Sequence, residues 1–213
     1  MSMKLYHCVS ARSFRPLWLL EELRLAYELV VVPFPPRVHR KDYFDVNPLG
    51  TVPAFLDGDT RMTESAAICE YIAARHDPGG LGVRPDEPAY GCYLNWLDFG
   101  EATLTFPLAL ILRYSRFEPR ERRLPQVSED YTRWFLARLK GVAAVVERQD
   151  FLCAGRFTAA DISVGYALIL AEDLGLREAM SEATRTYLDR LKAREGFSRA
   201  RAAERRAAEA SGI

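Results

Sequence analysis

The sequence has few cysteines and no long apolar run. Its 213 residues include four cysteines, and no two of them form a CxxC pair; they are Cys8, Cys69, Cys92 and Cys153. This usage is typical of a reduced, intracellular protein, and it offers no zinc-site spacing. No apolar run is longer than eight residues, whereas a transmembrane helix needs about 20. The N-terminus turns polar within a dozen positions, so we expect no signal peptide and a cytoplasmic location.

An excess of charge of either sign is also absent. Lys and Arg total 29, Asp and Glu total 29, and the formal net charge is zero. Nucleic acids and anionic membranes are bound mainly through clustered Lys and Arg, so the balance argues against both as partners. The histidines His7, His39 and His76 are too scattered to predict a metal site. Hydrophobic residues make up 49% and charged residues 27%, as in ordinary globular proteins.

Short strand-like and helix-like runs alternate through the first 77 residues. In chain order they predict a strand over 4–8, a helix over 14–25, strands over 28–32, 52–56 and 60–62, and a helix over 65–75. The turn Asp57-Gly58-Asp59 predicts a hairpin between the last two strands. Because parallel strands need a crossover connection, the first unit is predicted as βαβ and the second as a hairpin followed by a helix.

Residues 77–88 are rich in proline and glycine and mark the predicted domain boundary. Beyond them the pattern is helical, over roughly 89–115 with a kink at Pro107, then 128–148, 158–173 and 183–193. The alanine- and arginine-rich tail from Arg194 is either a frayed helix or disordered. We therefore predict a small α/β domain over residues 1–77, a linker over 78–88 and an all-helical domain over 89–213.

One helix start in the second half is unusually well marked. Thr158 at the N-cap and Asp161 three positions later approximate a capping box, and Phe157 is placed to pack on Ile162 as a hydrophobic staple. We interpret this as a folding signal that nucleates a buried helix, not as a functional site.

The stretch NPLGTVPAF (residues 47–55) is the first candidate for a binding site. A proline one residue into a strand is unusual because it removes a ladder donor. A cis Val52–Pro53 bond would explain a proline at position 53. The N–H and C=O of Val52 then turn outward and are free to pair with an extended, peptide-like ligand.

Thr63-Glu64-Ser65, immediately before a predicted helix, is the second candidate. Exposed backbone N–H groups at a helix start favour an anion, and the Ser65 hydroxyl adds a donor. Glu64 is suited to pair with an ammonium group. Together with the free backbone of Val52, these features predict a site for a small peptide with a free α-amino acid end.

These motifs resemble the glutathione transferase superfamily. The resemblance rests on the order of elements, on NPLGTVPAF, on the Glu-Ser pair before a helix, on FTAADIS (157–163) and on ARSFRPLWLLEEL (11–23), which is similar to the first helix of many bacterial and fungal members. It extends from Lys4 to about Ala200. It implies a thioredoxin-like N-terminal domain, an all-α C-terminal domain, a cytosolic, bacterial-like and serine-type class, and usually a homodimer.

The resemblance also implies roles for individual residues. Val52 and Pro53 would hold the cysteinyl backbone of glutathione, and Glu64 and Ser65 its γ-glutamyl end. The glycyl carboxylate would meet basic residues before the NPLG turn; Arg37, His39, Arg40 and Lys41 are available there, and His39 and Arg40 best match the family spacing. Glutathione is the expected co-substrate, without a metal.

The catalytic hydroxyl is less well defined. A free thiol of pKa about 8.5 is mostly protonated at neutral pH, so a donor must stabilise the thiolate. By resemblance this donor lies between the first strand and the first helix, where Ser10 is our first choice, Ser13 the second and Tyr6 the third. Ala11 stands where members that read SRS have their first serine. Arg12 stands where cysteine-type members have their cysteine, and it would supply positive charge near the thiolate.

Three functions remain open at this stage. The first is a detoxifying transferase that activates glutathione and conjugates it to a small apolar electrophile. The second is a non-catalytic glutathione-binding or protein-interaction module, which the missing serine at Ala11 keeps open. The third is a glutathione-dependent isomerase or thiol reductase, in which Cys8 would form a mixed disulfide; a cysteine on a strand is more often a small buried hydrophobe.

Overall fold

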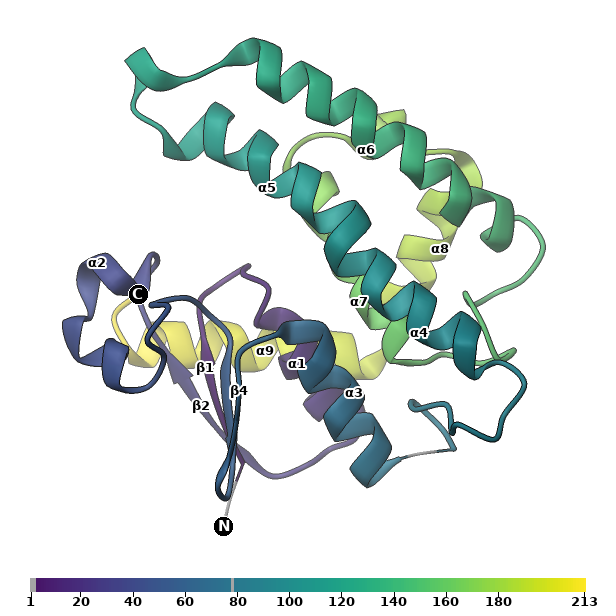
Figure 1. Ribbon diagram of the computed structural model, residues 1–213, viewed down its shortest axis with the longest axis horizontal. Coiled ribbons are helices and arrows are strands. Elements are labelled where there is room, and N and C mark those ends of the chain that lie inside the picture. The colour runs from purple at the N-terminus through teal and green to yellow at the C-terminus, as the bar shows by residue number, and fades with distance from the viewer. Residues whose placement is uncertain (1–2, 78) are drawn as a thin grey trace. The chain divides into compact units, whose positions relative to one another are not determined.

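The structure, a computed structural model, describes residues 3–77 and 79–213 (Figure 1). It divides into two compact units, one formed by Met1–Pro78 together with Lys192–Ile213 and the other by Gly79–Leu191. Pro78, the first residue of the predicted linker, lies outside the described residues. None of the helices in the described ranges is long and apolar enough to cross a membrane.

The first unit contains a four-stranded mixed sheet. Its strands are β1 (Met3–His7), β2 (Tyr27–Val31), β3 (Ala54–Asp57) and β4 (Thr60–Met62), in the order β2-β1-β3-β4. β1 runs parallel to β2, and both β1/β3 and β3/β4 are antiparallel. The sequence predicted this βαβ unit and hairpin, and the sheet confirms both. With its flanking helices the unit is a thioredoxin-like domain, as expected.

Helices also lie between and after the strands of this unit. They are α1 (Phe14–Glu22), the short α2 (Pro36–His39) and α3 (Ser65–His76), and a 3-10 turn, Lys41–Asp45, follows α2. α1 contacts both α3 and the C-terminal helix α9 (Glu195–Ala210) (Figure 1). The predicted bounds of α1 extended to residue 25, but the helix ends at Glu22 because Arg24 adopts a left-handed conformation, with φ of 52°.

Within the described residues the second unit is helical. It holds α4 (Tyr90–Asp98), α5 (Phe106–Leu112), α6 (Pro125–Val146), α7 (Ala159–Asp173) and α8 (Glu182–Lys192). Instead of one helix kinked at Pro107, the chain forms π-helical turns on each side of α5, over Phe99–Thr105 and Arg113–Phe117. Pro107 falls in the first turn of α5, where its missing N–H is tolerated. The predicted capping box at α7 is confirmed.

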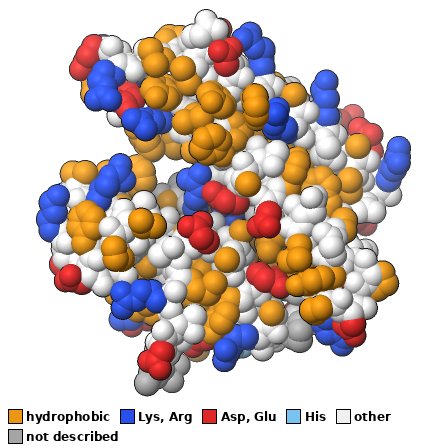
Figure 2. Space-filling view, viewed as in Figure 1, with side chains coloured by type: hydrophobic (Ala, Val, Ile, Leu, Met, Phe, Trp, Pro, Cys, Tyr) orange, Lys and Arg blue, Asp and Glu red, His pale blue; other side chains and the backbone are white. Residues whose placement is uncertain are grey.

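Hydrophobic side chains are exposed on the part of the second unit that holds α5 and α6. Figure 2 shows them gathered on one face of that region. The exposed large apolar residues of this part of the chain are Phe106, Phe117, Leu124 and Trp134. Such patches on globular proteins mark surfaces that bind a partner.

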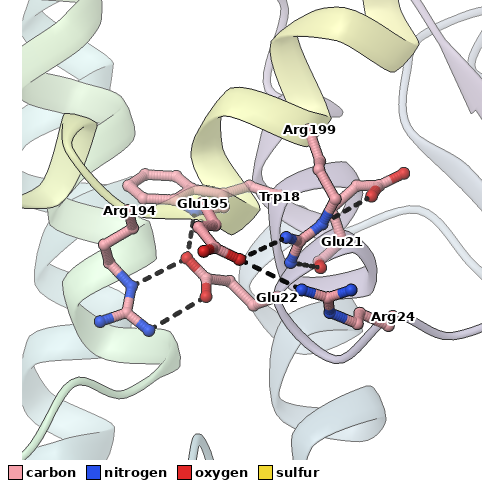
Figure 3. A network of polar contacts seen from close by, with 7 residues as sticks. All are labelled: Trp18, Glu21, Glu22, Arg24, Arg194, Glu195 and Arg199. Carbon is pink, nitrogen blue, oxygen red and sulfur yellow. Dashed lines mark hydrogen bonds and ion pairs between the residues drawn. The ribbon is translucent and has the colours of Figure 1, made fainter.

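The C-terminal segment does not join the helical unit, in which the sequence pattern had placed it. Helix α9 packs on α1 and β2 of the first unit instead. Figure 3 shows the polar part of this contact: the Glu22 carboxylate accepts hydrogen bonds from the Trp18 indole at 2.9 Å and from Nε and Nη2 of Arg194 at 2.8 and 3.0 Å. Gly196 allows the close approach, because a Cβ there would lie 2.3 Å from Glu22 Cδ.

The apolar face of α9 explains why the tail is an ordered helix. Phe197, Ala200, Ala203 and Ala208 are buried, and the Phe197 ring meets Trp18 edge-on at 5.0 Å between centroids. Small alanine side chains let the helix approach α1 closely, while the arginines between them remain near solvent. The composition of the tail alone does not reveal which surface this face covers.

Candidate active site

The loop between β1 and α1 places the three candidate hydroxyls in different surroundings. Ser10 is exposed and has a left-handed backbone, with φ of 58°. Ser13 is fully buried, and its Oγ lies 2.8 Å from His7 Nδ1 and accepts the Cys8 N–H at 3.3 Å. Tyr6 is half-buried on β1 with its ring against Tyr43. Ser10 is therefore the serine of the two that faces solvent.

Cys8 directly follows β1 and lies inside a small apolar cluster. The cluster consists of Cys8, Val32, Tyr43 and Ala54, with Tyr6, Ala11, Val30, Val46 and Val52 packed against it. It joins the β1–α1 loop to the segment that contains Val52. Burial raises the pKa of the Cys8 thiol to about 12. A thiol of this kind is scarcely ionised near neutral pH, which speaks against mixed-disulfide chemistry at this residue.

We expect a disulfide reagent such as DTNB to modify one thiol per chain quickly in the native protein, and that thiol to be Cys92. Cys92 is exposed, whereas burial raises the pKa of Cys8 and Cys69 to about 12 and that of Cys153 to about 11. The measurement is the time course of released chromophore. Cys92→Ser should abolish the fast phase, and loss of that phase in Cys8→Ser instead would restore the thiol-transfer alternative.

The NPLGTVP turn is held rigidly by its own residues. Asn47 is buried, its Nδ2 donates to the Thr51 carbonyl at 2.7 Å and its Oδ1 accepts the Leu49 N–H at 3.0 Å. Gly50 has φ of 60°, and a Cβ there would lie 2.6 Å from Arg37 Cβ, so the position requires glycine. These contacts fix the direction in which the chain enters β3.

Val52 leaves its backbone unpaired at the start of β3. The Val52–Pro53 bond is cis, as the sequence predicted, and the ladder to β1 begins only at Ala54. Across the described ranges 3–77 and 79–213, no hydrogen bond engages the Val52 N–H or C=O. An extended ligand lying along this segment would find one donor and one acceptor.

At the N-terminus of α3 the structure adds a residue that sequence reasoning missed. Glu64 is the exposed N-cap residue and Ser65 begins the helix, almost fully buried. Arg15, which is fully buried on α1, donates from Nη1 to Ser65 Oγ at 3.1 Å. Because the Ser65 oxygen accepts from Arg15, its own proton is directed to a further acceptor. The buried guanidinium also adds positive charge near a helix N-terminus that already favours anions.

Sequence spacing gave no signal for this role of Arg15. The residue lies between the apolar positions of a predicted helix, where an arginine is usually a solvated side chain. Its burial becomes visible only when α3 packs against α1.

The basic residues proposed for the glycyl carboxylate lie at and after α2. His39 is exposed, and Arg40 is half-buried and pairs with the exposed carboxylate of Asp42 at 2.6 Å. The Lys41 ammonium donates to the carbonyl of Arg37 at 3.0 Å. Arg12, in the β1–α1 loop, is half-buried. The structure thus joins Val52 to the β1–α1 loop and Ser65 to Arg15, whereas Arg40 and Lys41 form these hydrogen bonds within their own short segment.

Comparisons with known proteins show what this chain is similar to. Residues 1–74 match the family model described as the glutathione S-transferase N-terminal domain. This part of the chain is therefore similar to the N-terminal domain of glutathione S-transferases. Over 100 residues, 47% of this chain, it is 33% identical to glutathione S-transferase 3 of Schizosaccharomyces pombe, and it spans 41% of the length of that curated relative.

Solved structures extend the likeness of the fold beyond residues 1–74. A glutathione transferase from Methylococcus capsulatus superposes with a TM-score of 0.82 at 26% identity, over 95% of this chain and 98% of that one. Ure2p5 from Phanerochaete chrysosporium, cocrystallized with 1-(S-glutathionyl)-2,4-dinitrobenzene, gives 0.84 at 22% identity over 97% and 96%. The helical second unit therefore shares the fold of the same proteins.

Proposed function

We propose that this protein is a glutathione transferase, which binds glutathione, stabilises its thiolate and conjugates it to an apolar electrophile. The observation that carries the proposal is the unpaired backbone of Val52, packed on the same apolar cluster as the β1–α1 loop. A peptide held along Val52 would bring its central residue close to that loop. The Ure2p5 structure with a glutathionyl aryl conjugate supports this class of reaction.

In this proposal, each end of glutathione has its own set of contacts. Val52 and Pro53 hold the cysteinyl backbone, and Ser65 with the α3 N-terminus holds the γ-glutamyl carboxylate. Glu64 is exposed beside them and would pair with the ammonium group. The glycyl carboxylate would bind His39 and Arg40. To bind it, Arg40 would give up its ion pair with the exposed Asp42.

The chemical step needs little from the protein beyond position and charge. The glutathione thiol releases its proton to solvent, and the thiolate sulfur attacks an electrophilic carbon, from which a leaving group departs with its electron pair. Ser10 would donate a hydrogen bond to the thiolate, and Arg12 would add positive charge; the exposure of Ser10 favours it over the buried Ser13, with Tyr6 third. Stabilising the anion and holding it near the electrophile lower the barrier.

The proposal also includes the location, class and oligomeric state of the protein. We infer a cytoplasmic, bacterial-like, serine-type enzyme that acts in detoxification as a homodimer, and the exposed apolar residues on the α5–α6 part of the second unit support a partner surface there. The second candidate function is a glutathione-binding module without turnover. It is favoured by Ala11, which takes the place of a serine in the resembling motif.

A titration of bound glutathione by its ultraviolet thiolate absorbance tests the proposal. In the wild type we expect the bound thiol to titrate about two pKa units below the free value, because a hydroxyl donor and a helix N-terminus stabilise the anion. Ser10→Ala alone should abolish most of this shift, whereas Ser13→Ala and Tyr6→Phe should retain it. A bound thiol that titrates as it does in water would favour the binding module instead.

A further inference from the structure

A buried carboxylate from the C-terminal helix lies against the β1–α1 loop. Glu204, on α9, is 5% exposed. Its Oε1 accepts the Ser10 N–H at 2.8 Å and lies 2.9 Å from His7 Nε2. Its Oε2 accepts a hydrogen bond from Arg201 at 2.9 Å. One carboxylate therefore connects the end of β1, the loop and its own helix.

The contact continues through His7 to the far end of the loop. His7 Nδ1 lies 2.8 Å from Ser13 Oγ, which in turn accepts the Cys8 N–H at 3.3 Å. In a neutral His7 whose Nε2–H donates to Glu204, Nδ1 accepts the Ser13 hydroxyl proton. His7 and Ser13 are both fully buried. Two hydrogen bonds therefore hold the segment 8–13: one joins Ser10 to Glu204, and the other joins Ser13 to His7.

The charge on Glu204 is well compensated. Burial alone would raise the pKa of this carboxyl, but the hydrogen bonds from His7 and Ser10 and the charge of Arg201 outweigh it and lower the pKa. The carboxylate is therefore ionised at neutral pH. An ionised acceptor makes shorter and stronger hydrogen bonds than a neutral one.

The hydrogen bond from the Ser10 N–H to Glu204 also supports an unusual backbone conformation at Ser10. Its left-handed conformation, with φ of 58°, is unfavourable for a residue with a side chain and needs support from its surroundings. The Ser10 N–H is the group that Glu204 holds, and the conformation of this residue sets the direction of its hydroxyl. The candidate donor is consequently aimed by a side chain 194 residues away in the sequence.

We propose that Glu204, acting with His7, is a positioning residue that holds Ser10 in the orientation needed to stabilise the glutathione thiolate. This role rests on the proposed function, because it needs Ser10 as the donor. It predicts that an intact C-terminal helix is required for activation of the thiol and not for binding of glutathione, whose other contacts lie at Val52 and Ser65.

The test replaces Glu204 by Gln and compares it with Glu209→Gln, the same substitution at an exposed position on the same helix. Three quantities are measured: the hydrogen-exchange rate of the Ser10 amide, the pKa of bound glutathione thiol, and kcat and KM for glutathione with an aryl halide. For Glu204→Gln we expect faster exchange, a thiol pKa raised by about one unit and, at a pH below it, kcat lowered about tenfold. KM should change less than about threefold, and Glu209→Gln should match the wild type.

If Glu204 only stabilises the fold, the test gives a different result. In that case Glu204→Gln lowers the melting temperature, but the folded variant keeps the wild-type thiol pKa and kcat, and the proposal is overturned. An unchanged Ser10 exchange rate overturns it as well. If Glu204→Gln does not fold, Glu204→Asp keeps the buried charge but shortens the side chain, and the same shifts are expected.

Failure of the proposed function has its own signature. It appears in the wild type, as bound glutathione whose thiol pKa is that of the free peptide. The hydrogen-exchange rate of the Ser10 amide then still shows whether Glu204 holds the loop, since its measurement requires neither ligand nor turnover.

Discussion

Replacing Asp161 by alanine should lower the free energy of unfolding of the protein by about 3–5 kcal/mol, because each buried donor left without its acceptor costs about 1–3 kcal/mol. The Asp161 carboxylate is fully buried and accepts hydrogen bonds from the Thr158 N–H at 2.8 Å, the Leu152 N–H at 3.0 Å and the Tyr187 hydroxyl at 2.7 Å. Burial raises the pKa of this carboxyl, although each of these donors works in the opposite direction. Removing the carboxylate leaves these donors, and the Thr158 hydroxyl that donates to it at 3.1 Å, without this acceptor in the core.

Denaturant unfolding followed by circular dichroism measures this loss. Asp98→Ala, the same substitution at an exposed position of the same unit, serves as the control and should change stability by no more than about 0.5 kcal/mol. Tyr187→Phe removes one of these donors and should cost about 1 kcal/mol. An Asp161→Ala variant as stable as Asp98→Ala would show that the capping network does not stabilise α7.

Ser65→Ala should weaken glutathione binding by about 1–3 kcal/mol, which is roughly a 5- to 150-fold higher Kd. The hydroxyl accepts from the buried Arg15 at 3.1 Å and is therefore directed to donate its proton outward, at the N-terminus of α3. Without it a bound carboxylate loses a donor in a site that water reaches poorly, and Arg15 loses a partner. Isothermal titration calorimetry with glutathione gives the dissociation constant directly.

The matched control is Ser198→Ala, an exposed serine of the same unit, which should bind glutathione like the wild type. The melting temperature of each variant separates lost binding from lost folding. An unchanged dissociation constant in a folded Ser65→Ala variant would contradict the placement of the γ-glutamyl end at α3.

Much of the first unit was predictable because its signals are local. The predicted strands over 4–8 and 28–32 are displaced from β1 and β2 by one residue, and the helix over 65–75 matches α3 to within one. The turn that precedes Val52 was equally predictable, since proline fixes the backbone angle φ and glycine allows the positive φ that turns require. The cis bond at Phe34–Pro35 and the short helix α2 carried no comparable signal and were not predicted.

The candidate site was predictable only in part, for a related reason. Residue types and spacing indicated Val52, Glu64 and Ser65, whose proposed roles depend on their own short segments. Nothing local distinguished exposed Ser10 from buried Ser13, because both are serines in one loop of a few residues. Their difference arises where His7 and Glu204 meet that loop.

The sequence by itself therefore determined the order of elements in the first unit, the cap of α7 and the turn before β3. Each depends on backbone preferences and hydrogen bonds within a few residues. The tertiary structure decided that α9 returns to the first unit, that Arg15 supports Ser65 and that Glu204 holds Ser10. These contacts join residues 50 and 194 positions apart, and they form only when packing of the apolar faces of separate helices brings the polar groups together in a core that excludes water.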